Sequence, residues 1–491
     1  MMQHLPILLI VLPLIAAPMF VLIRDRNVVL GSAIAVCWAT FFSACVLLQQ
    51  TMETGEVSYF IGNWKPPYGI EYRIDPLSAF VLLFVSFIGA MVISFAHASV
   101  EREIPLSKQY LFYATYMLCL TGLLGIVVTG DLFNLFVFLE ISSLSSYALI
   151  SLGRSRRALM AAFQYLVMGT VGATFLLIGI GLVFQLSGSL NMVDIGQRLT
   201  ESHGSRTILV AIAFVAVGVS IKMALFPLHY WLPNAYTYAP SVVSAFIAAT
   251  ATKVSVYILL RLMFTIFNPG FAFSTLPLDT KIMGLSLIGI FVASWVAIFQ
   301  TNVKRLLAYS SIAQIGYMLL GISFASEMGL TGGIIHMFNH AIIKGALFMA
   351  VACFALRVNT VNLCDLSGIS KRMPWTCFVF VIGGLALVGV PLTGGFISKW
   401  YLLVAAFDAG YWPVAAMILM SSLLALIYVW KVVEVIYFGE LDETNADVQE
   451  APLSMLIPTY IVVGLTVVFG IWTAFPAGVA RQAAMQLMGN A

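Results

Sequence analysis

Charged residues are scarce in this sequence. Asp, Glu, Lys and Arg make up 9% of its 491 residues, whereas hydrophobic residues make up 61%. The mean hydropathy is +1.00. A soluble globular protein has about 25% charged residues with which to cover its surface. The composition therefore excludes a soluble domain of this size and predicts a polytopic membrane protein.

Motifs for cofactor chemistry are also missing. There is no GxGxxG after a strand, no GxxxxGK[ST] and no histidine pair in a haem-like context. The six cysteines form no CxxC and no Cys/His cluster with metal-ligand spacing, so we expect structural thiols. The net charge is +3, and the basic residues form no continuous tract. Nucleic acid is therefore excluded as a partner. We expect no cofactor, no metal site and no enzymatic active site.

Long apolar runs are abundant instead. A run of about 20 residues can cross a hydrocarbon core about 30 Å thick. Fourteen such runs lie at 5–23, 28–48, 75–97, 109–129, 132–151, 159–186, 207–236, 241–267, 280–300, 303–323, 327–356, 375–406, 411–438 and 454–475. The first has no basic segment before it, so we expect a retained helix rather than a signal peptide.

Basic residues favour one set of connections between these runs. The connections after the first, third, fifth, ninth and eleventh runs hold twelve Lys and Arg residues, and the alternate connections hold five. The positive-inside rule places the basic connections in the cytoplasm. Because the number of runs is even, we expect both termini on the outer side of the membrane.

Two of the predicted spans contain helix breakers beside a lysine. The run 207–236 continues from Lys222 as KMALFPLHYWLPNAY, and its prolines should break the helix near Phe226. The run 375–406 contains GVPLTGGFISKW, in which proline and two glycines precede Lys399. Interrupted membrane helices in corresponding positions of two halves indicate an internal repeat with a transport path between its members.

Ionisable residues recur well inside the predicted spans. They are Glu140, Lys222, His229, Lys253, His336, His340, Lys344 and Lys399. A charge at membrane depth costs a few kcal/mol, so such residues usually face the protein interior or water and serve transport. Histidine titrates near neutral pH, and desolvation shifts the pKa of a buried lysine or glutamate toward neutral pH. The set can therefore exchange protons without a metal. We interpret these eight residues as a proton path.

Other roles stay open for single residues. Any one lysine could be a buried ion-pair partner that fixes helix packing. His229 could hydrogen-bond carbonyl groups freed by the neighbouring proline. His336, His340 and Lys344 recur every four residues and form one polar stripe, which suits a hydrated path or a polar contact between helices. Asp131, at a helix junction, is predicted to cap the following helix.

Five segments in chain order carry a resemblance. FVFLEISSLSSYALI, KMALFPLHYWLPNAY, AATATKVSVYILLR, HMFNHAIIKGALF and PLTGGFISKW resemble the antiporter-like subunits. That superfamily includes proton-pumping subunits of respiratory complex I, membrane subunits of energy-converting hydrogenases and the two large subunits of Mrp-type multisubunit Na⁺/H⁺ antiporters. The resemblance implies that Glu140 pairs with Lys222. It implies a hydrated axis that continues through Lys253, His336 and His340 or Lys344 to Lys399.

The resemblance also implies a domain organisation. It predicts one all-α membrane domain over 1–491, with three N-terminal helices in 1–108. Two inverted five-helix repeats follow, helices four to eight in 109–267 and nine to thirteen in 280–438, each with one interrupted helix. The last helix is expected at 454–475.

The branch of the superfamily is indicated by fewer features. Lys399 departs from the complex I branch that carries glutamate there, and the length and the wording FPLHYWLPNAY resemble the D-type member of Mrp antiporters. That resemblance implies a proton-translocating subunit in a bacterial cytoplasmic (inner) membrane. Its partners would be a larger homologous subunit and several small membrane subunits, and its ions protons and Na⁺. A complex I or hydrogenase subunit remains an alternative, as does a membrane scaffold that has lost the chemistry.

Overall fold

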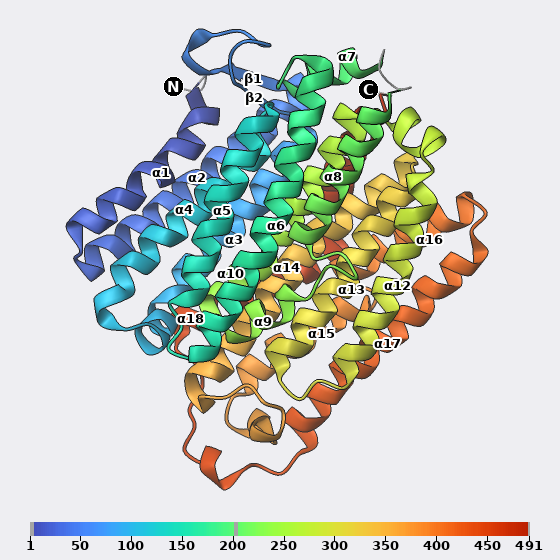
Figure 1. Cartoon of the computed structure of the whole chain (residues 1–491). Coiled ribbons are helices and arrows are strands. Elements are labelled where there is room, and N and C mark those ends of the chain that lie inside the picture. The colour runs from blue at the N-terminus through green and yellow to red at the C-terminus, as the bar shows by residue number, and fades with distance from the viewer. Residues whose placement is uncertain (1–3, 201–204, 490–491) are drawn as a thin grey trace.

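A computed structural model describes residues 4–200 and 205–489 of the chain. Within those residues, thirteen helices are long and apolar enough to cross a membrane, and a bent pair (Cys364–Lys371 with Pro374–Val388) would make fourteen. The helices form one bundle, with a small β-hairpin at one end (Figure 1). The predicted all-α polytopic fold is confirmed.

Twelve helices begin at or close to the start of a predicted span. They are α1 (Leu5–Ile23), α2 (Arg26–Thr54), α3 (Pro76–Glu103), α4 (Gln109–Val128), α5 (Leu132–Ser151), α6 (Arg156–Ser187), α8 (Arg206–Met223), α12 (Leu278–Ile298), α13 (Val303–Ser323), α14 (Glu327–Val358), α17 (Trp412–Phe438) and α18 (Leu453–Ile471). Side-chain caps fix several starts. The Asp131 carboxylate accepts the Asn134 N–H at 2.7 Å, as predicted, and Asn302 accepts the Arg305 N–H at 3.2 Å.

Both predicted interruptions are present. In the first, α8 ends at Met223, Ala224 is left-handed (φ 58°), and α9 (Trp231–Tyr238) begins after an irregular turn. The Trp231 indole N–H donates to the Ile221 carbonyl at 2.9 Å, which satisfies one acceptor freed by the break. In the second, α15 (Pro374–Val388) ends at Gly389 (φ 89°), and α16 (Gly394–Asp408) follows.

A third irregularity was not predicted. The run 241–267 divides into α10 (Ser241–Ala249) and α11 (Ala251–Leu260), with Thr250 between them at φ −119° and ψ −60°. The segment then widens into the π-helix η5 (Arg261–Ile266). No proline or glycine marks either position, so nothing in the sequence signals them.

A hairpin and two helices are the longer elements that extend beyond the predicted spans. They are the hairpin of β1 (Val57–Phe60) with β2 (Glu71–Ile74), the short helix α7 (Met192–Leu199), and α19 (Ala474–Leu487). The hairpin is antiparallel, with Val57 opposite Ile74 and Phe60 opposite Glu71. Two short β-branched and aromatic stretches form its strands, and the glycines and prolines around them obscure this signal in the sequence.

Helix α14 is the centre of the bundle (Figure 1). It packs against α10, α13, α15, α16, α18 and α19. Every residue from Gly329 to Phe354 is buried. A helix that is buried on all faces must satisfy its polar side chains within the protein, and α14 carries the predicted stripe of two histidines and a lysine.

The two ends of the described chain lie at the same end of the bundle (Figure 1). His4 contacts Tyr59 of β1 through a 3.2 Å hydrogen bond. Gln486 of α19 lines a cavity together with Arg73 of β2. This agrees with an even number of membrane crossings.

Helices α6 and α8 approach each other through small residues. A Cβ at Gly218 would lie 2.7 Å from the Gly172 carbonyl oxygen, and one at Gly179 would lie 2.4 Å from Val215 Cγ2. Small residues allow this approach between membrane helices, where lipid provides no hydrophobic driving force for association. The contact positions α8 and therefore Lys222.

Gly179→Ala should lower the melting temperature of the purified protein, because overpacking costs about 1–3 kcal/mol. Gly181→Ala is the matched control in the same helix, since a Cβ there meets nothing within 4 Å. Differential scanning fluorimetry of both variants measures the effect. Equal melting temperatures would contradict the close α6–α8 contact.

Candidate functional site

Seven of the eight predicted residues lie in a series through five helices. The series, called the polar series below, comprises Glu140 (α5), Lys222 (α8), Lys253 (α11), His336, His340 and Lys344 (α14), and Lys399 (α16). All but Glu140 are buried. It therefore begins at a partly exposed carboxylate and continues through buried nitrogen groups.

The first member is an ion pair. Lys222 Nζ lies 3.3 Å from Glu140 Oε1 and donates to Ser143 Oγ at 2.8 Å. The contact between Glu140 and Lys222 is thus present as predicted. It is longer than the 2.7–2.9 Å of a strong charge-assisted bond, so the serine hydroxyl is the closer partner of the ammonium. The Lys222 side chain is 4% exposed and that of Glu140 is 26% exposed.

A small cavity joins this pair to α11. Its volume is about 20 Å³, and Lys222, Ser142, Ser143, Ser146 and Ser255 supply its polar lining. A cavity of at least about 10–15 Å³ with several polar partners is large enough for one water. The cavity therefore provides a polar connection between Lys222 and the helix that carries Lys253.

Lys253 is fully buried beside the irregular turn at Thr250. Its ammonium donates to the Ala248 carbonyl and lies 3.5 Å from Thr252 Oγ1. The break in the helix thus supplies an acceptor that a regular helix would have used internally. This explains how the lysine is accommodated here without a carboxylate as hydrogen-bond acceptor.

The stripe on α14 has the expected geometry. The rings of His336 and His340 are parallel within 3°, with centroids 6.0 Å apart. One turn further, Lys344 donates to the Leu307 carbonyl at 2.8 Å and to the Ser310 hydroxyl. Neither ring nitrogen of His340 has a hydrogen-bond partner among the described residues. Buried polar atoms of this kind are normally satisfied by ordered water.

Lys399 ends the series at the second interrupted helix. Its Nζ donates to the Val388 carbonyl at 2.8 Å and to Ser422 Oγ at 3.0 Å. Val388 is the last residue of α15, where the helix dipole favours a cation. Lys399 also lies 4.8 Å from the centre of the Tyr317 ring. A Cβ at Gly389 would lie 3.0 Å from Lys399 Cδ, so glycine there makes room for the lysine stem.

A serine and a tyrosine link Lys399 to α14. His336 Nδ1 is 2.8 Å from the hydroxyl of Ser398, the residue before the lysine. The Tyr317 ring is 5.4 Å from that of His336 and close to Lys399. The stripe on α14 and the terminal lysine are therefore parts of one polar cluster.

His229 lies apart from the polar series. It is in the irregular turn between α8 and α9, and its ring stacks on that of Phe226 at 5.2 Å and meets that of Tyr309 edge-on at 6.4 Å. It lines a separate cavity of about 210 Å³ together with Arg305 and Tyr309. Both of these ring contacts are to aromatic residues outside the polar series, although His229 is close to Lys222 in the sequence.

The hydrogen-bond partners of the lysines bear on the alternative that each lysine is a buried ion-pair partner that fixes helix packing. Lys222 is paired with Glu140, whereas the hydrogen bonds of Lys253, Lys344 and Lys399 go to carbonyl and hydroxyl oxygens. Among the described residues, those three lysines therefore bind no carboxylate that would hold helices together. Within residues 4–200 and 205–489, no group of three or more His, Cys, Asp and Glu side chains is placed to hold a metal ion.

Sequence reasoning missed several partners of the series. Tyr317, Ser398 and Ser422 contact its last members, and none has a distinctive context in the sequence. One signal was available: Tyr257 and Arg261 follow Lys253 at spacings of four, which places all three on one helix face.

The comparisons with known proteins agree on the family. The family model described as NADH:quinone oxidoreductase/Mrp antiporter, TM matches residues 129–425. The chain is 40% identical to the N-type subunit of NADH-quinone oxidoreductase from Desulforudis audaxviator, over 95% of each chain. It is 30% identical to the D-type subunit of a Na(+)/H(+) antiporter from Alkalihalophilus pseudofirmus, over 96% of this chain and 94% of that one.

Two solved structures have the same fold. A chain in the membrane-bound sulfane sulfur reductase, an archaeal respiratory membrane complex, matches with a TM-score of 0.89 and 28% identity, over 99% of this chain and 98% of that one. A chain in the Mrp complex from Dietzia sp. matches with a TM-score of 0.91 and 24% identity, over 99% and 97%. The chain belongs to the NADH:quinone oxidoreductase/Mrp antiporter transmembrane family.

Proposed function

We propose that this chain is the proton-translocating subunit of a multisubunit monovalent cation (Na⁺)/proton antiporter. The observation that carries the proposal is the polar series, in which buried basic groups on three further helices follow one ion pair. Relatives named as D-type antiporter subunits match nearly the whole chain. Transport through the bundle, rather than an enzymatic reaction, is the activity that this arrangement suits.

The Glu140–Lys222 pair is suited to act as a switch. A neighbouring carboxylate favours the charged form of a lysine, and separation of the two removes that preference. Lys222 already shares its ammonium between Glu140 and Ser143. A shift of α5 against α8 would therefore release a proton from Lys222 toward the small cavity and Lys253.

Further proton transfers follow from the proximity of the basic side chains in the polar series. Like charges in a poorly solvated interior repel each other, so a proton on one base raises the free energy of protonating the next. The imidazoles of His336 and His340 lie between Lys344 and Lys399, and histidine both accepts and donates protons. A proton that arrives at one end of the series thus favours release at the other.

Two five-helix repeats, 109–267 and 280–438, are part of this proposal. Two equivalent backbone bridges support them: Asp131 pairs with Asn191, and Asn302 pairs with Asn362. Each bridge joins the residue that caps the second helix of a proposed repeat to the segment after the third. Those third helices, α6 and α14, both have 32 residues.

The exposure of Glu140 supports the proposal that this chain assembles with other membrane subunits. Its side chain is 26% exposed on the surface of this chain at membrane depth, beside the exposed Leu144. An ionised carboxylate that faces lipid is costly. We infer that partner subunits, including a larger homologue and small membrane proteins, cover part of this surface. The distribution of basic connections supports an orientation with both termini on the outer side of a bacterial cytoplasmic membrane.

A second candidate is a proton-pumping membrane subunit of a redox-driven complex. The observation that favours it is the 40% identity to a protein named as an N-type subunit of NADH-quinone oxidoreductase. Lys399, which ends the polar series as a base, favours the antiporter. Neighbouring genes separate the two: small membrane proteins alone support the antiporter, whereas iron–sulfur or hydrogenase subunits support the redox complex.

Glu140→Ala and Lys222→Ala should each abolish cation-driven proton flux while the assembled complex stays in the membrane. Either change removes one half of the proposed switch. Acridine orange fluorescence in inverted vesicles measures the flux after Na⁺ addition. Glu434→Ala, which removes an exposed carboxylate of α17 outside the series, is the control and should transport normally. Normal flux in the first two variants would refute the switch.

Lys399→Arg tests proton release at the end of the series. Arginine keeps the charge but does not deprotonate, because its pKa stays above 12. We expect normal assembly and loss of most transport. Lys431→Arg is the matched control, since Lys431 also binds helix-end carbonyls, those of Ile298 at 2.8 Å and Gln300 at 3.1 Å. Near-normal transport by Lys399→Arg would show that the path bypasses this residue.

The isolated chain should not catalyse coupled exchange. The polar series runs from one helix to the next, so coupling to a second ion requires neighbouring subunits. Purified chain in liposomes should show no Na⁺-dependent change in internal pH, whereas the complete complex should. Robust exchange by the chain alone would contradict the proposed dependence on partners.

A further inference from the structure

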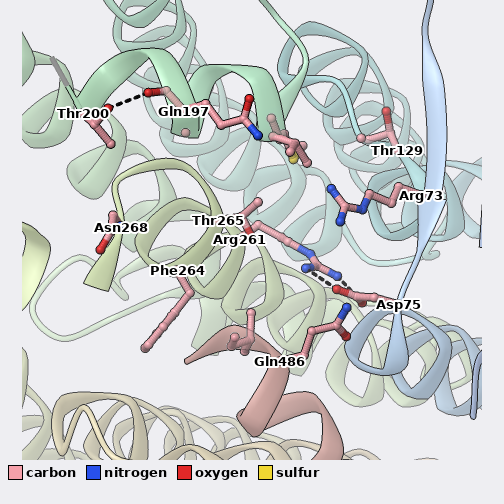
Figure 2. Close-up of a pocket in the computed structure, with 15 residues that line it drawn as sticks. Arg73, Asp75, Thr129, Gln197, Thr200, Arg261, Phe264, Thr265, Asn268 and Gln486 are labelled. Atoms are coloured by element: carbon pink, nitrogen blue, oxygen red, sulfur yellow. Dashed lines mark hydrogen bonds and ion pairs between the residues drawn. The ribbon is translucent and has the colours of Figure 1, made fainter. Parts of the chain in front are cut away.

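A polar cavity of about 400 Å³ opens at the end of the bundle where both ends of the described chain lie. Its lining comes from β2, the N-cap of α3, the α4–α5 junction, α7, η5 and α19. Figure 2 shows its polar lining, with Arg261 and Asp75 joined by hydrogen bonds and Arg73 and Gln486 on either side of them. The polar series does not include any of these residues.

The Arg261–Asp75 pair closes the inner side of the cavity. Arg261 donates from Nη1 to Asp75 Oδ2 at 2.7 Å and from Nη2 to Ser78 Oγ at 2.8 Å. Both charged side chains are 10% exposed. Burial alone would raise the pKa of Asp75, but the charge and hydrogen bonds of the Arg261 guanidinium hold it below its usual value. The charged form of the carboxyl group is therefore favoured, and the two side chains form an ion pair.

Two hydrogen bonds lead from this pair toward the helix turn that carries Lys253. Arg261 Nε donates to the Tyr257 hydroxyl at 2.8 Å, and that hydroxyl donates to the Val127 carbonyl at 2.8 Å. Lys253 lies one further turn along the same helix face. At 1.5 Å per residue, Lys253 is about 12 Å below Arg261 along the helix. The π-helix begins at Arg261, and such irregular turns are frequent at functional sites.

The charges around the cavity argue against a site for an anionic ligand. Arg73 donates from Nη2 and Nε to Glu56 Oε2 at 2.7 and 3.1 Å. Arg261 is neutralised by Asp75 in the same way. With both guanidinium groups paired, the described lining leaves no unpaired positive charge to bind an anion. Water suits a cavity lined by this many neutral polar side chains.

We propose that this cavity is an aqueous vestibule through which Lys253 exchanges protons with the solution, and that the Asp75–Arg261 pair is its gate. This inference rests on the proposed function. When the Arg261 guanidinium turns into the cavity, which has room for it, the Tyr257 hydroxyl becomes accessible to water. The vestibule gives the first half of the chain a proton route to the same end as both termini, separate from Lys399.

Thiol labelling tests the gate without any transport assay. Cys45→Ala and Cys364→Ser remove the two native cysteines that are not buried. In that background, Thr265→Cys on the cavity wall should react rapidly with a membrane-impermeant thiosulfonate. Ser78→Cys, behind the pair, should react slowly, and about tenfold faster when combined with Arg261→Gln.

Ser86→Cys is the matched control, because Ser86 is fully buried two turns deeper in α3. It should stay unlabelled in both backgrounds. A Thr265→Cys that fails to react, or a Ser78→Cys rate unaffected by Arg261→Gln, would overturn the proposal. Labelling as expected in a complex that transports no ions would refute the proposed function and leave the vestibule standing.

Passive proton leak distinguishes a gate from a packing contact. Vesicles with Arg261→Gln in the assembled complex should lose an imposed pH gradient about tenfold faster than wild type. Arg261→Lys, which keeps an ion pair with Asp75, should remain tight. Arg73→Gln, which breaks the pair with Glu56 at the rim, should also remain tight. Unchanged leak per assembled Arg261→Gln complex would show that the pair only stabilises the fold.

Discussion

The burial of ammonium groups in an apolar bundle is the constraint on which this structure depends. An unpaired charge in such surroundings costs several kcal/mol unless other groups solvate it. Lys222 meets this cost with a carboxylate. Lys253 and Lys399 instead bind carbonyl groups exposed where a helix is broken, and Lys344 binds the Leu307 carbonyl and the Ser310 hydroxyl. Bases held by neutral acceptors keep the freedom to lose a proton, which a tight ion pair would remove.

The irregular parts of the fold follow from the same requirement. The turn at Thr250, the end of α15 at Gly389 and the break after α8 each lie beside a lysine of the polar series. Regular helices would have used those carbonyls internally. Close α6–α8 packing and the buried α14 hold these breaks in place. In this arrangement the regular helices fix the positions of the lysines, and the breaks provide the carbonyl groups that accept their hydrogen bonds.

Much of this was visible in the sequence, because its signals are local. Apolar runs give the spans, and proline and glycine mark two of the breaks. The stripe on α14 follows from helix periodicity alone. The turn at Thr250 and the π-helix at Arg261 depend on tertiary contacts and carry no breaker residue. Asp75 and Arg261 are 186 residues apart, so their pairing required the fold. The separation of His229 from the series also required the fold, because the position of a residue in the sequence does not show which residues its side chain contacts.

The central claim is that the polar series is one hydrated path. The most direct test is a high-resolution cryo-EM map of the complete complex in lipid nanodiscs, inspected between Lys222, Lys253 and His340. The account predicts ordered waters at hydrogen-bonding distances, about 2.7–3.2 Å, that join the three side chains. Apolar side chains that seal the space between Lys253 and His340 in every conformational class would contradict it.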